Sequence, residues 1–163
     1  MAFTIVLVEP EIPQNAGNIS RTCAVTGCKL IFVRPLGFEV TDKHLKRAGL
    51  DYWQYLDISY YDSIEEVMDK FYNGSNFHFF STKSNKIHSQ ATFKDGDFLV
   101  FGKESKGLPE DLLKKHYDEC VRIPMMGDLR SLNLSKSVCV GVYEGLRQLN
   151  YPGFNTEGFI PKR

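Results

Sequence analysis

Three polar loops carry most of the residue types that could bind a ligand or do chemistry. Each is rich in Gly, Pro, Asn, Ser or Arg and follows a short run typical of a buried strand; they span residues 9–18, 102–109 and 124–135. In an open α/β sheet, ligands bind beyond the carboxyl ends of the strands. We therefore expect the functional site where these three loops come together.

The second loop argues against common nucleotide-binding classes. Gly102 and Gly107 have the outer spacing of a phosphate loop, but Leu108 and Pro109 stand where such a loop requires Lys followed by Ser or Thr. No G-x-G-x-x-G follows the first apolar run, and the nucleophile elbow G-x-S-x-G of many hydrolases is missing as well. Taken alone, this loop is also consistent with a plain turn between a strand and a helix.

The histidines and cysteines do not have the spacing of a metal site. The chain contains no His-Glu-x-x-His and no Cys-x-x-Cys pattern. We expect no bound metal, histidines on the surface or in the core, and reduced cysteines that lie mostly in the core. These residues are His44, His78, His88, His116, Cys23, Cys28, Cys120 and Cys139.

The first loop runs into a predicted helix with two amides and a guanidinium near its start. In a purely structural role, Asn15 or Asn18 would cap the helix and Arg21 would pair with Glu9 or Glu11. In a functional role, an arginine fork near a helix N-terminus is suited to hold a phosphate. The residues alone leave both interpretations open.

Net charge gives no long-range attraction for nucleic acid. The chain has 20 Lys and Arg residues against 20 Asp and Glu residues, so any contact with RNA must come from local basic patches. On charge alone, the favoured interpretation is that these patches are ordinary solvated surface. They comprise Lys43, Lys46, Arg47, Lys103, Lys106, Lys114, Lys115, Arg122, Arg130 and Lys136.

The elements that position the loops alternate between strand and helix. The predicted strands span residues 3–8, 29–33, 57–60, 76–81, 97–101 and 119–123, and the predicted helices 15–26, 42–48, 63–72, 109–115 and 135–149. This order predicts a single-domain α/β three-layer sandwich, over residues 1–163, around a mostly parallel six-stranded sheet. No stretch is long enough to span a membrane, so we expect a cytoplasmic protein.

Two glycines in the last predicted helix need a physical reason. Gly141 and Gly145 lie one turn apart, and each costs about 1 kcal/mol of helix stability relative to Ala. Their register predicts a close approach of the helix backbone to another element or subunit.

Together, the loops resemble the three signature motifs of the SPOUT methyltransferases, in the same order and over nearly the whole chain. The likeness extends to the small tRNA wobble-nucleotide 2′-O-methyltransferases of the TrmL/YibK type. The blocks that carry it are residues 9–18 (EPEIPQNAGN), 47–52 (RAGLDY), 101–109 (FG with GLP) and 122–135 (RIPM with RSLNLS).

The resemblance implies a fold and an activity. The fold would include a C-terminal trefoil knot that binds S-adenosyl-L-methionine, releases S-adenosyl-L-homocysteine and forms the interface of a homodimer. The substrate would be a tRNA anticodon stem-loop, methylated at the wobble ribose of cytidine or carboxymethylaminomethyluridine. The alternatives are a 2′-O-methyltransferase for another tRNA or rRNA site, and a non-catalytic RNA- or nucleotide-binding module of the same fold.

The resemblance also assigns roles to individual residues. Arg21 and Asn133 would serve catalysis, Asn133 by holding its loop or the methionine part of the cofactor. Because a guanidinium with a pKa above about 12 is a poor base, Arg21 would position phosphate and stabilise the developing alkoxide. Tyr143 is a further candidate for RNA contact or proton handling, or else a core or interface residue. The cofactor pocket would be lined by Phe80, Gly102, Glu104, Ile123 and Ser131.

Overall fold

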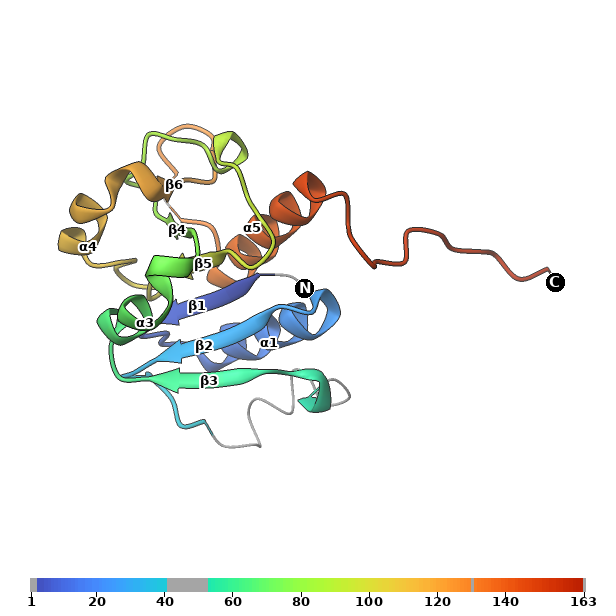
Figure 1. Cartoon of the computed structure of the whole chain (residues 1–163), viewed down its shortest axis with the longest axis horizontal. Helices are drawn as coiled ribbons and strands as arrows, with labels where there is room; N and C mark the ends of the chain where they lie inside the picture. The colour runs from blue at the N-terminus through green and yellow to red at the C-terminus, as the bar shows by residue number, and fades with distance from the viewer. Residues whose placement is uncertain (1–2, 41–52, 130, 163) are drawn as a thin grey trace.

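Six parallel strands form one sheet at the centre of the molecule (Figure 1). The computed structural model describes residues 3–40, 53–129 and 131–162. The strand order is β3-β2-β1-β5-β4-β6, and all the pairings between these strands are parallel. The strands are β1 (Thr4–Val8), β2 (Lys29–Val33), β3 (Ile58–Tyr61), β4 (Phe77–Phe80), β5 (Phe98–Phe101) and β6 (Cys120–Val121). The predicted α/β class and six-stranded sheet are confirmed.

Helices cover both faces of the sheet. Within the described residues, the α-helices are α1 (Pro13–Thr26), α3 (Ile64–Phe71), α4 (Glu110–Lys115) and α5 (Leu134–Gln148). Short 3-10 helices are η1 (Trp53–Tyr55), η2 (Tyr72–Gly74), η3 (His88–Gln90) and η4 (Tyr117–Glu119). The helix predicted over residues 42–48, the basic cluster of Lys43, Lys46 and Arg47, the block 47–52 and Arg130 lie outside the described residues.

Alternate residues of the strands point to opposite layers, which produces two apolar cores. In β1, Ile5 and Leu7 pack with apolar residues of α1 and α5, whereas Val6 and Val8 pack with residues of α3 and α4. The strands are buried on both faces, as expected for a parallel sheet between two helical layers. This arrangement is the predicted three-layer sandwich, and no helix in the described part is long and apolar enough to cross a membrane.

The two glycines of α5 allow the helix to lie directly on aromatic rings of the sheet. A Cβ on Gly145 would lie 2.5 Å from the end of the Phe3 ring, and one on Gly141 would lie 2.9 Å from the end of the Phe80 ring. The predicted close approach is therefore confirmed, and the neighbouring elements belong to the same chain.

In the described part of the chain, two predicted elements have a boundary that differs from the structure by more than one residue. Helix α1 begins at Pro13 after Ile12, so Asn15 is not its cap, while its end at Thr26 is as predicted and Gly27 follows with a φ of +71°. The predicted strand 119–123 is reduced to two residues, because Glu119 belongs to η4 and Arg122 forms only an isolated bridge with Ile87.

Candidate active site

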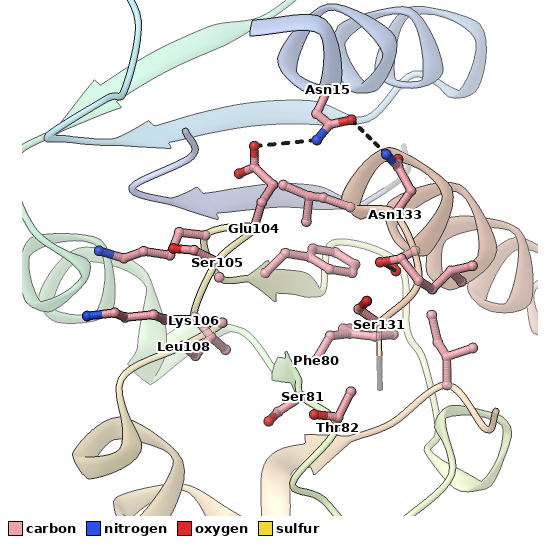
Figure 2. Close-up of a pocket in the computed structure, with 18 of the residues that line it drawn as sticks. Asn15, Phe80, Ser81, Thr82, Glu104, Ser105, Lys106, Leu108, Ser131 and Asn133 are labelled. Atoms are coloured by element: carbon pink, nitrogen blue, oxygen red, sulfur yellow. Dashed lines mark hydrogen bonds between the residues drawn. The ribbon is translucent and has the colours of Figure 1, made fainter. Parts of the chain in front are cut away.

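The three polar loops meet at the carboxyl edge of the sheet and enclose one pocket of about 440 Å³. Figure 2 shows side chains from all three loops around this space. The lining residues fall within 12–15, 80–83, 101–108, 123–125 and 131–137. This volume lies in the range of small-molecule and cofactor sites.

All the residues predicted to contact a cofactor line this one pocket, although they come from four separate segments. They are Phe80, Gly102, Glu104, Ile123 and Ser131, and Asn133 lines the pocket with them. The structure thus brings together the predicted pocket residues.

The Glu104 carboxylate ties the second loop to the first. Its Oε1 accepts a hydrogen bond from the backbone N–H of Glu11 (2.9 Å), and its Oε2 accepts one from that of Ile12 (2.6 Å). The side-chain amide of Asn15 donates to Oε2 as well, at 3.4 Å. The family resemblance leaves two roles open for Glu104, shaping the pocket or facing the substrate, and these contacts support the first.

Asn133 ties the third loop to the first. Its Nδ2 donates to Oδ1 of Asn15 at 3.2 Å, while its Oδ1 accepts from the backbone N–H of Ser135 at 2.9 Å and thereby caps α5. Asn15 is therefore bonded on one side to Glu104 and on the other to Asn133 (Figure 2). We call these three residues the polar junction.

Sequence reasoning missed the role of Asn15 in the junction. It treated this residue as a candidate helix cap, but the side chain is buried and spans two other loops. The sequence did offer one signal: the first loop contains two asparagines, Asn15 and Asn18, and only one of them is needed to cap a helix. Its contacts are more than eighty residues away, so local patterns do not predict them.

A second contact joins the first two loops beside the junction. The Glu11 carboxylate accepts hydrogen bonds from the hydroxyl (2.6 Å) and backbone N–H (2.9 Å) of Ser105. These bonds, with Lys103 and Lys106 nearby, lower the pKa of Glu11. The carboxylate thus stays ionised at neutral pH and keeps accepting from the second loop.

The second loop turns so tightly that it needs glycine. A Cβ on Gly102 would lie 2.0 Å from the carbonyl carbon of Gly107, and the backbone N–H of Gly107 donates to the carbonyl of Lys103 at 2.8 Å. Gly107 has a φ of +69°, which favours glycine. Both glycines line the pocket, and because they have no side chain, the loop presents only its backbone to the pocket at these two positions.

Aromatic residues form an apolar wall of the pocket. The rings of Phe80 and Phe101 are stacked with centroids 4.5 Å apart, and Gly141 lies against both. Ile123 and Leu108 line the same space. A planar ring system could bind against this wall while its polar edge contacts the backbone of the loops.

The two other residues singled out from the sequence lie outside the pocket lining. Arg21 is exposed on α1, and Tyr143 is 42% exposed on α5, so Tyr143 is not a core residue. Within the described residues, no group of three His, Cys, Asp or Glu side chains could hold a metal ion. Each described cysteine is a free thiol, and three are buried.

Comparison with known proteins places this geometry in a family. The model of the SpoU rRNA Methylase family matches residues 2–143. The chain belongs to this family.

Curated relatives of this SpoU family member share nearly its whole length. A protein of Bacillus subtilis named putative tRNA (cytidine(34)-2′-O)-methyltransferase is 47% identical over 154 residues, covering 93% of this chain and 96% of that protein. The tRNA (cytidine(34)-2′-O)-methyltransferase of Escherichia coli is 45% identical over 152 residues, with the same coverage.

Solved structures agree with the fold. A putative RNA methyltransferase from Bacillus anthracis is 46% identical, with a TM-score of 0.88 over 96% of this chain and 99% of that one. A structure described as giving insights into the 2-OH methylation of C/U34 on tRNA is 44% identical, with a TM-score of 0.86 over 91% and 97% of the two chains. The SpoU methyltransferase AviRb from Streptomyces viridochromogenes, solved with AdoMet, is 24% identical with a TM-score of 0.80 over 91% and 58%, and supports the fold.

Proposed function

We propose that this SpoU-family protein transfers a methyl group from S-adenosyl-L-methionine to the ribose 2′-hydroxyl of the wobble nucleotide of tRNA, a cytidine or a carboxymethylaminomethyluridine. The observation that carries the proposal is the polar junction, which closes three separate loops around one pocket. Relatives of nearly the same length that are 45–47% identical carry the corresponding name, which supports the choice of nucleotide.

The pocket fits the proposed cofactor. Its volume of about 440 Å³ is sufficient for a folded nucleoside with an amino acid tail. Phe80 and Ile123 would flank the adenine, the backbone of the turn at Gly102 would contact its polar edge, and Ser131 would contact the remaining polar groups. When bound, the cofactor supplies a methyl group on a positively charged sulfur, and it leaves as S-adenosyl-L-homocysteine.

The protein's own residues then have to hold and orient the RNA. Glu104 and Asn133 keep the loops closed around the pocket through Asn15. Arg21, exposed on α1, would bind an RNA phosphate and stabilise the negative charge that develops on the 2′ oxygen. A guanidinium stays protonated in proteins, so Arg21 is unsuited to remove the hydroxyl proton.

The proposal includes a homodimer. Helices α1 and α5 lie together on one face of the sheet (Figure 1) and expose Val25, Val140 and Tyr143. A contiguous patch of exposed apolar side chains is typical of an interface, and Val140 and Tyr143 lie three residues apart on one side of α5. A second subunit would also enlarge the surface available to an anticodon stem-loop. Sedimentation as a monomer at working concentration would contradict the dimer.

We infer one domain over residues 1–163, located in the cytoplasm, with a C-terminal trefoil knot. The path of the chain supports the knot: after β6 at the sheet edge, Arg122 exchanges backbone hydrogen bonds with Lys86 and His88. The chain then returns to place α5 against Phe3 and Phe80.

The test is a methylation assay on tRNA that lacks this modification. The protein is incubated with labelled S-adenosyl-L-methionine and tRNA from a strain without the gene, and the labelled nucleoside is mapped. We expect label on the ribose of nucleotide 34. Label on another ribose of tRNA or rRNA would move the activity to a different site, and no label with retained RNA binding would indicate a non-catalytic binding module.

A further inference from the structure

A second, smaller pocket lies next to the proposed cofactor pocket. It has a volume of about 220 Å³ and is formed between α4 with η4 and the segment 81–84. Leu113 and Cys120, both buried, lie at its apolar floor. Burial raises the pKa of the Cys120 thiol to about 11, so this cysteine contributes a neutral surface rather than a nucleophile.

The two pockets share a wall. Ser81 and Lys83 line both of them. Hydrogen bonds hold this wall in place: the backbone N–H of Ser81 donates to the carbonyl of Val121 at 2.9 Å, and the buried Ser84 hydroxyl donates to the carbonyl of Cys120 at 2.8 Å. An occupant of the smaller pocket would therefore lie directly beside an occupant of the larger one.

The rim of the smaller pocket carries one aromatic ring and more positive than negative charge. Tyr117 lines the pocket and is 45% exposed. Glu110 accepts a hydrogen bond from Lys83 at 2.5 Å, and Lys83 and Lys114 together lower its pKa. Two lysines thus face one carboxylate, which leaves one positive charge for an anionic ligand.

We propose that the smaller pocket receives a nucleobase of the substrate RNA next to the methylated nucleotide, with Tyr117 stacked on the base and Lys114 near its phosphate. This inference rests on the proposed function. A volume of about 220 Å³ suits one nucleoside, and proteins that read single-stranded RNA combine aromatic stacking with positive charge in this way. A lysine serves here as a point charge for phosphate.

The test compares Tyr117→Ala with Tyr117→Phe, which keeps the ring. Stacking of one base on an aromatic ring contributes to the binding free energy of the RNA. The KM for tRNA should therefore rise about tenfold in Tyr117→Ala and stay near wild type in Tyr117→Phe. Tyr55→Ala is the matched control, because Tyr55 is 70% exposed on η1 and lines neither pocket. The Kd for S-adenosyl-L-methionine should be unchanged in each variant.

A second readout separates this inference from the proposed function. The Kd for an anticodon stem-loop oligonucleotide is measured for each variant and for Lys114→Gln. The Lys114→Gln substitution should also lower the slope of log Kd against log salt concentration by an amount equal to about one phosphate contact. If wild-type protein methylates no tRNA, the proposed function fails while the Kd still tests the pocket. Equal KM and Kd for Tyr117→Ala and Tyr55→Ala would overturn the inference, as would a Tyr117→Ala effect confined to binding of free adenosine 5′-monophosphate.

Discussion

The proposed cofactor pocket is positioned by two regions that work by different physical means. The polar junction of Glu104, Asn15 and Asn133 joins three loops through hydrogen bonds at 3.4 and 3.2 Å. The glycine contacts, in which α5 lies on Phe3 and Phe80, are steric and leave no space for a methyl group.

The two regions differ in how far they can adjust. Hydrogen bonds at a solvent-accessible pocket can be replaced by water at modest cost, so the junction controls where the loops lie without controlling whether the chain folds. Buried contacts at van der Waals distance have no such replacement. We therefore expect changes at the junction to affect ligand binding and changes at the glycine contacts to affect stability.

The largest effect is expected from Arg21→Ala. Arg21 lies on the same helix as Asn15 but outside the pocket lining, so the cofactor Kd should stay near wild type. Loss of a group that stabilises developing charge should lower kcat about a hundredfold to a thousandfold. Arg21→Lys keeps the charge without the fork and should restore only part of the rate. Near-normal turnover of Arg21→Ala would remove this residue from the mechanism.

Local patterns predicted most elements of this fold. Strand Lys29–Val33 was predicted with both ends correct, because the apolar run indicates a strand and Gly27 and Pro35 on either side limit its length. Ser63 followed three residues later by Glu66 also predicts a capped helix start, and this is confirmed, since the Ser63 hydroxyl accepts from the backbone N–H of Glu66 at 3.2 Å. Such elements need information from only a few neighbouring residues.

The start of α1 could not be predicted in this way. The backbone N–H groups of Glu11 and Ile12, just before the helix, donate to the carboxylate of Glu104. A carboxylate from a distant loop thus accepts hydrogen bonds at the start of the helix, where the side chain of a local N-cap residue would otherwise accept them. The resemblance to the SPOUT family identified the pocket residues, but only the folded chain reveals that Asn15 links them.

The glycine contacts should separate stability from binding. In Gly145→Ala the new methyl group would meet the Phe3 ring, which is 1% exposed and packs against Phe93. Overpacking should outweigh the gain in helix propensity, and the free energy of unfolding should fall by about 2 kcal/mol. Urea denaturation measures this change.

Gly141→Ala is the matched variant one turn away. Its methyl group would meet Phe80, whose ring lines the pocket and can move into that space. We expect a smaller loss of stability than for Gly145→Ala and a weaker affinity for S-adenosyl-L-methionine, measured by calorimetry. Equal stability of the two variants with unchanged cofactor affinity would contradict the distinction.

A smaller effect is expected from Glu104→Gln. The amide keeps one acceptor oxygen, but its NH2 group would face a backbone N–H of Glu11 or Ile12, so one of these donors loses its partner. The loops should close less often, and cofactor affinity should fall about tenfold, which corresponds to about 1.4 kcal/mol. The melting temperature without ligand should stay within a few degrees of wild type. A large drop in the melting temperature with unchanged cofactor affinity would show that Glu104, like the glycine contacts, acts on stability rather than on binding.

The smallest effect concerns pH and the anchoring of α5. The hydrogen bonds from Arg147, with those from Gln148, lower the pKa of Glu144 from 4.5 to about 2. A carboxyl group with a lowered pKa in the folded state stabilises the protein above about pH 4.5, and this contribution is lost as the pH falls toward 2. Because the Arg147 side chain is 60% exposed, the pair should contribute only about 0.5–1 kcal/mol.

Glu144→Gln should therefore be less stable than wild type at pH 7, and the gap should shrink by roughly half at pH 3. Urea denaturation at the two pH values measures the gap, with Glu157→Gln in the exposed C-terminal segment as the control. Glu144 is bonded to Gln148, which in turn contacts the carbonyl of Ala91 and the N–H of Phe93. A gap that did not depend on pH would show that Glu144 acts through this neutral network rather than through its charge, and α5 would then be held by packing and amide contacts alone.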